Sequence, residues 1–139
     1  MGGTSTRWKG NRLSVTFTWT LPHDSRAPAQ GRWHLRELAS NAIEAADAEL
    51  VVTELITNAW KHGYGEITLR VEVAEEVMHI EVCSASDDDP RATTLGGASE
   101  DAVEADGRGL LLIEGLAKRW GFDRRGSVVC VWADVSRVM

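Results

Sequence analysis

Four polar side chains in the segment ELVVTELITNAWKHG could together carry out phosphoryl transfer. Glu54 and Asn58 are four residues apart, so on a helix they project from the same side about one turn apart. Lys61 and His62 continue the polar row up to Gly63. A carboxylate can accept a proton from a nucleophile, an amide oxygen can bind Mg²⁺, and a cation can contact phosphate. Phosphoryl transfer needs these three functions.

A simpler explanation is that these side chains are ordinary solvated charges of a helix, and for each residue taken alone it is the better one. Asn in a helix interior, however, lowers helix propensity. The order Glu, three residues, Asn-Ala and then His-Gly is also longer than a chance pair. A second motif that agrees with it therefore favours a functional site.

That second motif is DGRGLLLIEGLAKRWG, in which Gly107 and Gly109 flank Arg108 directly before a predicted helix. Backbone amides at a helix N-terminus bind anions, and an arginine can strengthen the binding. For an isolated triplet the simpler explanation is again the better one: Gly107 ends a loop and Gly109 allows close helix packing. The order of the surrounding elements favours the anion site.

Hydrophobic periodicity predicts the elements that must position these residues. We expect strands at residues 13–21, 66–73, 77–83 and 128–135, and helices at about 29–39, from near 47 to 63, and at 109–119. The first helix follows a capping Asp24 or Ser25, and a turn at Gly126 precedes the last strand. The inward faces of the three helices are predicted to be Trp33, Leu35, Leu38 and Ala39; Val52, Leu55, Ile56 and Ala59; and Leu111, Leu112, Leu116 and Ala117.

Two segments lack this periodicity. Residues 1–12 are polar and rich in Gly, Ser and Thr, which predicts a flexible N-terminus before one domain over residues 13–139. Residues 84–108 carry many acidic and small residues and almost no large apolar side chain. A long loop of this kind inside a compact domain usually has a function.

Composition limits the class of protein. The chain has 139 residues, 43% of them hydrophobic, which is enough for one core. Its formal net charge of -6 disfavours direct binding to nucleic acid. No apolar run is long enough to cross a membrane, and no secretion signal is recognisable, so we expect a soluble cytoplasmic protein.

The two cysteines, Cys83 and Cys130, lie in apolar, strand-like runs. Cysteine in such runs usually behaves as a small buried hydrophobe. We therefore expect two buried thiols in a reducing compartment, and a disulfide or a metal site is the less favoured alternative.

Taken together, the motifs resemble the Bergerat-type ATP-binding superfamily of histidine kinases and type II topoisomerases, and within it the small anti-sigma-factor serine kinases. Glu54, Asn58 and His62-Gly63 are similar to its N box. The run from Gly107 to Leu110 is similar to its second glycine motif, and LAKRWG is also typical. The resemblance covers nearly all of residues 13–135.

The resemblance implies an α/β fold of two layers, with a mixed, largely antiparallel sheet covered on one face by helices. It also implies that Glu54 is the general base, that Asn58 binds Mg²⁺, and that residues 84–106 close over ATP. Lys61, His62, Gly63, Gly107, Arg108, Gly109 and Leu110 would contact the nucleotide. The implied partners are a sigma factor and an anti-anti-sigma protein whose serine or threonine is phosphorylated. A homodimer is a further expectation.

One position departs from the family pattern. After the strand ending at Cys83 the family usually places an Asp that accepts a hydrogen bond from the adenine amino group, and Ser84 takes that place here. A neutral hydroxyl forms a weaker bond than a carboxylate. Asp87 could replace it only if the loop slips by three residues. ATP binding is therefore expected to be weaker.

Two other functions stay open. The chain could be a binding module that keeps the fold but has lost useful nucleotide affinity, or a detached histidine-kinase-like ATPase domain. Six tryptophans are many for this length, and most are expected in the core. For Trp8 and Trp33, near the first strand and helix, core packing and a role in dimerisation or sigma-factor binding are equally favoured.

Overall fold

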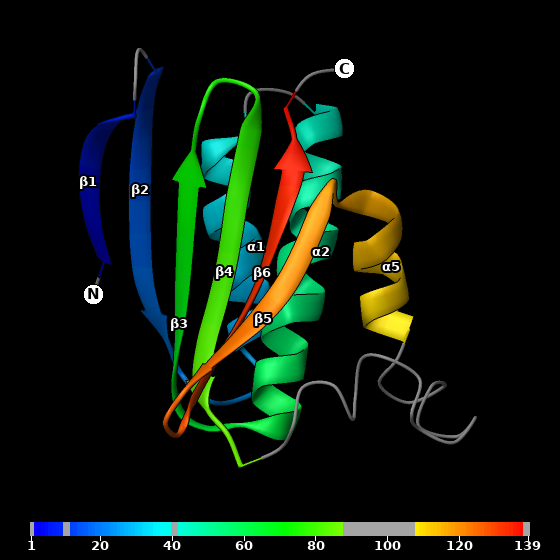
Figure 1. The fold of residues 1–139 in the computed structure, drawn as a ribbon. Coiled ribbons are helices and arrows are strands. Elements are labelled where there is room, and N and C mark those ends of the chain that lie inside the picture. Colours follow the sequence, from blue (N-terminus) through cyan, green and yellow to red (C-terminus); the bar gives the residue numbers. More distant parts are fainter. Residues whose placement is uncertain (1, 10–11, 40–41, 88–107, 138–139) are drawn as a thin grey trace.

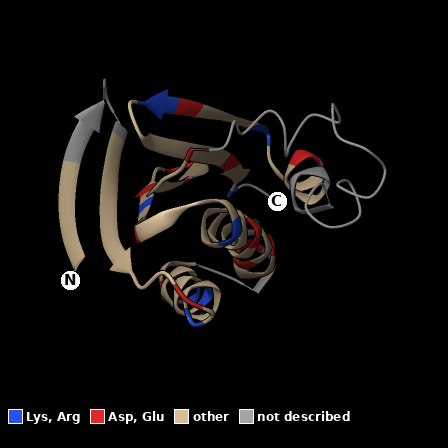
Figure 2. Ribbon diagram, turned by 90° about the horizontal axis from the view of Figure 1, so that it is seen from below, with Lys and Arg blue, Asp and Glu red and all other residues tan. Residues whose placement is uncertain are grey.

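The computed structural model describes residues 2–9, 12–39, 42–87 and 108–137. Six strands form one sheet in the order β1-β2-β3-β4-β6-β5, and every neighbouring pair is antiparallel. The three helices of the described residues cover one face of this sheet, as Figures 1 and 2 show. The predicted two-layer arrangement is confirmed. The sheet is antiparallel throughout the described strands.

The elements follow one another along the chain as β1 (Gly2–Lys9), β2 (Arg12–Leu21), α1 (Ala27–Leu38), α2 (Ala42–His62), β3 (Tyr64–Val73), β4 (Val77–Ala85), α5 (Arg108–Leu116), β5 (Arg119–Arg125) and β6 (Val128–Ser136). The predicted hairpin of β3 and β4 and the closing strand β6 are confirmed, with Gly126 in the left-handed region at φ 64° before β6. Helix α2 begins five residues earlier than expected.

The N-terminal prediction is wrong, because residues 2–9 form β1 and pair along their whole length with β2. This strand lies at the edge of the sheet, and its residues 2–6 are exposed. A stretch of strand such as residues 2–6, which is exposed on both faces, has no reason to alternate apolar and polar residues. The alternation test that identified β2 could therefore not find it.

The opposite edge strand, β5, was also not predicted. Its sequence RWGFDRR places charged residues at both ends, and we assigned its first residue to the preceding helix. That helix, α5, ends at Leu116. Its core residue is Ile113, which is fully buried, whereas Leu112, which was predicted to face inward, is 45% exposed.

The core lies between the sheet and the helices, and the predicted face of α2 forms its centre. Val52, Leu55 and Ile56 are fully buried, and Ala59 packs against them. Each such aliphatic side chain contributes about 1.5–3 kcal/mol of burial free energy. The second layer is therefore held to the sheet mainly by α2.

Helix α1 differs from the prediction at its start and on its buried face. Its N-cap is Arg26, whose backbone N–H donates to the Asp24 carboxylate at 2.8 Å. The face that it buries carries Ala27, Gly31 and Leu35, and Trp33 is 58% exposed. The imidazole of the next residue, His34, stacks on Trp19 of β2, and burial lowers the pKa of His34.

The cysteine prediction is also wrong, because Cys83 and Cys130 form a disulfide. They are direct cross-strand partners in the β4–β6 ladder. In β4 the buried side chains are those of Met78, Ile80, Val82 and Ser84. Cys83 therefore belongs to the alternate set, on the sheet face that none of the described helices covers. Sequence alone does not give the register that brings the two thiols together.

Candidate functional site

Helix α2 carries the first predicted motif and has two different flanks. On one flank α1 packs, with Arg36 donating to Glu49 at 2.7 Å and Arg32 to Thr53 at 3.3 Å. Each residue of a helix turns the side-chain direction by about 100°. Glu54 and Asn58 therefore lie on the other flank. Helix α5 contacts α2 on the side away from α1, as Figure 2 shows.

Glu54 and Asn58 are both half-buried at the border between the core face and solvent. Among the described residues, neither side chain makes a hydrogen bond or an ion pair. Both are therefore available to a ligand. Lys61, one turn further, is exposed, whereas His62 is half-buried. By the same helical rotation Lys61 lies on the flank of Glu54 and Asn58, and His62 lies between that flank and the core face.

The end of α2 touches the end of β4 at Gly63. A Cβ atom on Gly63 would lie 2.5 Å from the Ser84 hydroxyl oxygen and 2.7 Å from the carbonyl oxygens of Ala59 and Ala85. Gly63 does not have a positive φ. The predicted helix end at Gly63 is confirmed, but the glycine is required for space and not for a left-handed turn.

Alanine at position 63 should therefore destabilise the protein, by about 1–3 kcal/mol as other overpacked sites do. Two of the three contacts are with backbone oxygens, which cannot rotate away. Urea unfolding followed by circular dichroism measures the loss. The control is Gly115→Ala in α5, where a Cβ meets nothing within 4 Å. That change should raise the free energy of unfolding by about 0.5–1 kcal/mol, because alanine has the higher helix propensity. Equal stability of Gly63→Ala and wild type would contradict the contact.

Ser86 fixes the end of β4 against the helix. Ser86 donates its hydroxyl to the His62 carbonyl at 2.7 Å and its N–H to the Ser127 carbonyl at 2.8 Å. Arg124 donates to the Ser86 carbonyl at 2.9 Å. These contacts were not predicted, because a Ser-Ala-Ser sequence gives no signal for a partner 24 residues away.

Ser84 lies within the paired part of β4, opposite Val129, and is only 6% exposed. Asp87 follows the strand and is exposed. The register therefore places Ser84, and not Asp87, beside the end of α2. The loop slip that would exchange them is not seen.

The second motif begins α5, whose first turn contains Arg108, Gly109 and Leu110. The helix starts beside the second half of α2 and runs antiparallel to it (Figure 1). The two motifs, which are separated by more than forty residues in sequence, are thus brought to the same side of the molecule. Gly107 and most of the predicted lid, residues 88–107, lie outside the described residues.

A comparison with protein families finds one that fits this arrangement. The family described as the histidine kinase-like ATPase domain matches residues 29–133. The chain belongs to this family. The match runs from α1 to β6 and includes both motifs. Membership in this ATPase-domain family implies nucleotide binding, usually with Mg²⁺. Among curated proteins, no match was found. None of the described helices has the length and apolar character needed to span a membrane.

Proposed function

We propose that this ATPase-like domain binds Mg-ATP on the α5 flank of α2 and acts as a protein serine/threonine kinase and anti-sigma factor. The observation that carries the proposal is the pair Glu54 and Asn58, one helical turn apart, half-buried and not engaged by other described side chains. The donor set fits the ligand. An amide oxygen is a suitable ligand for a hard cation such as Mg²⁺, and the first turn of α5 presents backbone N–H groups to phosphate.

Each residue of the proposed site has a separate role in phosphoryl transfer. Glu54 would accept the proton of the attacking serine or threonine hydroxyl. Asn58 would hold Mg²⁺, which supplies neutralisation of the phosphate charge when bound. Lys61 extends the flank with a positive charge. Arg108, which belongs to the second motif, would add a donor suited to phosphate oxygens.

The partners proposed for the domain rest on the resemblance to anti-sigma-factor kinases. The domain would hold a sigma factor inactive in the cytoplasm and phosphorylate an anti-anti-sigma protein, with a homodimer as the working state. Trp33, exposed on α1, supports a protein-binding role for that helix, since aromatic side chains are enriched at interfaces. The negative net charge disfavours direct contact with nucleic acid.

The kinase activity is tested by incubating the full chain with radiolabelled Mg-ATP and candidate anti-anti-sigma proteins that are encoded by genes neighbouring its own. We expect label on a serine or threonine of one antagonist, and no label when EDTA removes Mg²⁺. If no antagonist accepts phosphate although sigma-factor binding is measurable, the kinase function is rejected.

A second function, a binding module with impaired nucleotide affinity, is favoured by Ser84. This side chain is neutral, buried and pressed against Gly63, at the position where the family resemblance calls for a carboxylate. Calorimetry separates the two functions. Micromolar binding of Mg-ATP supports the kinase, and the absence of heat at millimolar nucleotide supports the module.

Replacement of Ser84 by Asp should tighten ATP binding about tenfold, since a charge-assisted hydrogen bond contributes about 1–1.5 kcal/mol more than a neutral one. The measurement is calorimetric titration with Mg-ATP. The matched control is Asp87→Asn, which removes an exposed carboxylate three residues later and should leave the affinity unchanged. If Asp87→Asn weakens binding and Ser84→Asp does not tighten it, Asp87 is the residue that meets adenine.

A further inference from the structure

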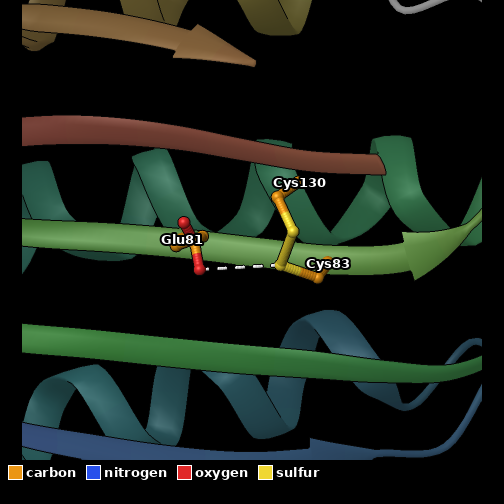
Figure 3. Close-up of side chains that lie close together, drawn as sticks. All are labelled: Glu81, Cys83 and Cys130. Atoms are coloured by element: carbon orange, nitrogen blue, oxygen red, sulfur yellow. Dashed lines mark hydrogen bonds between the residues drawn. A yellow bond between two sulfur atoms is a disulfide. The ribbon is translucent and has the colours of Figure 1, made fainter. Parts of the chain in front are cut away.

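The cysteine pair lies on the sheet face that the proposed nucleotide site does not use. Cys83 and Cys130 face each other across β4 and β6, with their Cα atoms 4.1 Å apart. Figure 3 shows both sulfur atoms beside the carboxylate of Glu81. Glu81 precedes Cys83 by two residues, so both side chains leave β4 on the same face.

Three atoms that bind metals thus converge at one point of the sheet. The Glu81 carboxylate oxygen Oε1 lies 3.6 Å from the Cys83 sulfur. That oxygen and the two sulfur atoms all lie within 4.8 Å of one another. In a tetrahedral zinc site, bonds of about 2.3 Å to sulfur and about 2.0–2.2 Å to oxygen separate the two ligand atoms by about 3.5 Å. The oxygen and the Cys83 sulfur already have this spacing.

We propose that the reduced protein binds one thiophilic divalent cation, of the class of Zn²⁺, through Cys83, Cys130 and Glu81. Two thiolates and a carboxylate give three protein ligands, and water takes the fourth position because Glu81 and Cys83 are only half-buried, on the face that none of the described helices covers. The two sulfurs move apart to about 3.7 Å, the spacing that the same bond lengths require. Rotation about the cysteine side-chain bonds provides this movement.

The strands hold the ligands in place before the metal binds. β4 and β6 are interior strands, each paired on both sides, so the backbone that carries the three ligands is fixed. Rigid ligand positions favour metal binding because less order has to be created. Glu81 also pairs with Arg70 at 3.7 Å, but Arg70 is about half exposed and can turn its guanidinium to solvent.

Metal binding and the disulfide exclude each other, because the thiolate is the form of cysteine that binds metals. Reduction by a thiol reagent uses two of its molecules, which supply two electrons and two protons and become a disulfide themselves. The protein then holds two thiols. Zn²⁺ displaces their two protons, so the binding is favoured by higher pH.

The test uses the full chain, reduced with an excess of small thiol, freed of it without oxygen, and titrated with Zn²⁺ against a chromophoric chelator. We expect one Zn²⁺ per chain, and with Co²⁺ the absorption of a cobalt–thiolate bond. Protein oxidised with diamide to the disulfide should bind neither ion. If the reduced chain fails to compete for zinc at micromolar concentration, the site does not exist.

Variants then identify the ligands. Cys83→Ser and Cys130→Ser should each weaken zinc binding at least about 100-fold. Glu81→Gln should weaken it about 10- to 100-fold, since replacing even a residue outside the coordination shell lowers metal affinity by that much. The matched control is Glu72→Gln on the same face of β3, which should bind like wild type. Circular dichroism verifies that each variant is folded. Wild-type affinity in Glu81→Gln, or in either serine variant, overturns the three-ligand site.

Discussion

Replacement of Glu54 by Ala should lower the rate of phosphate transfer to the antagonist by about 10²- to 10⁴-fold, the contribution typical of a general base. Nucleotide affinity should change little, because the carboxylate would act on the attacking hydroxyl and not on ATP. Glu54 is half-buried on the α5 flank of α2, and its loss removes no hydrogen bond or ion pair among the described residues. Single-turnover transfer of radiolabelled phosphate measures the rate, and calorimetry measures ATP binding.

Two further variants separate base chemistry from loss of charge. Glu54→Gln keeps the size of the side chain but cannot accept the proton, so it should be as slow as Glu54→Ala. Glu49→Gln removes a carboxylate on the opposite flank of the same helix, where it pairs with Arg36, and should transfer phosphate at the wild-type rate. If Glu54→Ala loses ATP binding as well as transfer, Glu54 holds the nucleotide and is not the base.

The elements with one buried and one polar face could be predicted from the sequence. Helix α2 and the strands β3 and β4 have this property, and their periodicity determines both type and orientation. The edge strands β1 and β5 could not be predicted in this way. They are stabilised by backbone pairing along one side, and such pairing makes few demands on the side chains.

The same physical difference divides the site. Glu54 and Asn58 could be placed together because four residues along one helix fix their spacing. The contacts between α2 and β4, such as Ser86 with His62, depend on how a helix end meets a strand end. The Cys83 and Cys130 pair depends on the register of two strands that are separated by α5 and β5 in sequence. Periodicity contains no information about either arrangement.

Trp33 illustrates a different difficulty. Its spacing from Leu35 and Leu38 agrees only roughly with one helix face. The structure buries the predicted Leu35, but Gly31 and not Trp33 lies beside it on the buried face. Gly31 lies against Ile56 and Val52 of α2. The close approach of the two helices needs a residue without a side chain at that point. The large indole ring is therefore displaced to the solvent side.

Replacement of Arg137 by Met should cost about 3–5 kcal/mol of the free energy of unfolding, the usual result when a buried charge loses its partner. Arg137 donates Nε to the Glu44 carboxylate at 2.7 Å and Nη1 to the Ala74 carbonyl at 2.5 Å. The Glu44 side chain is only 3% exposed. These contacts join the end of β6 to the first turn of α2 and to the β3–β4 turn.

Urea unfolding of single and double variants measures this coupling. Glu44→Leu together with Arg137→Met removes both charges, and the pair should regain most of the loss because no buried charge is left unpaired. Arg36→Met is the matched control, since it removes an exposed arginine that is ion-paired with Glu49 at 2.7 Å, and should cost less than about 1 kcal/mol. A double variant as unstable as Arg137→Met alone would mean that the loss comes from the Ala74 contact, and that Glu44 tolerates burial without the guanidinium.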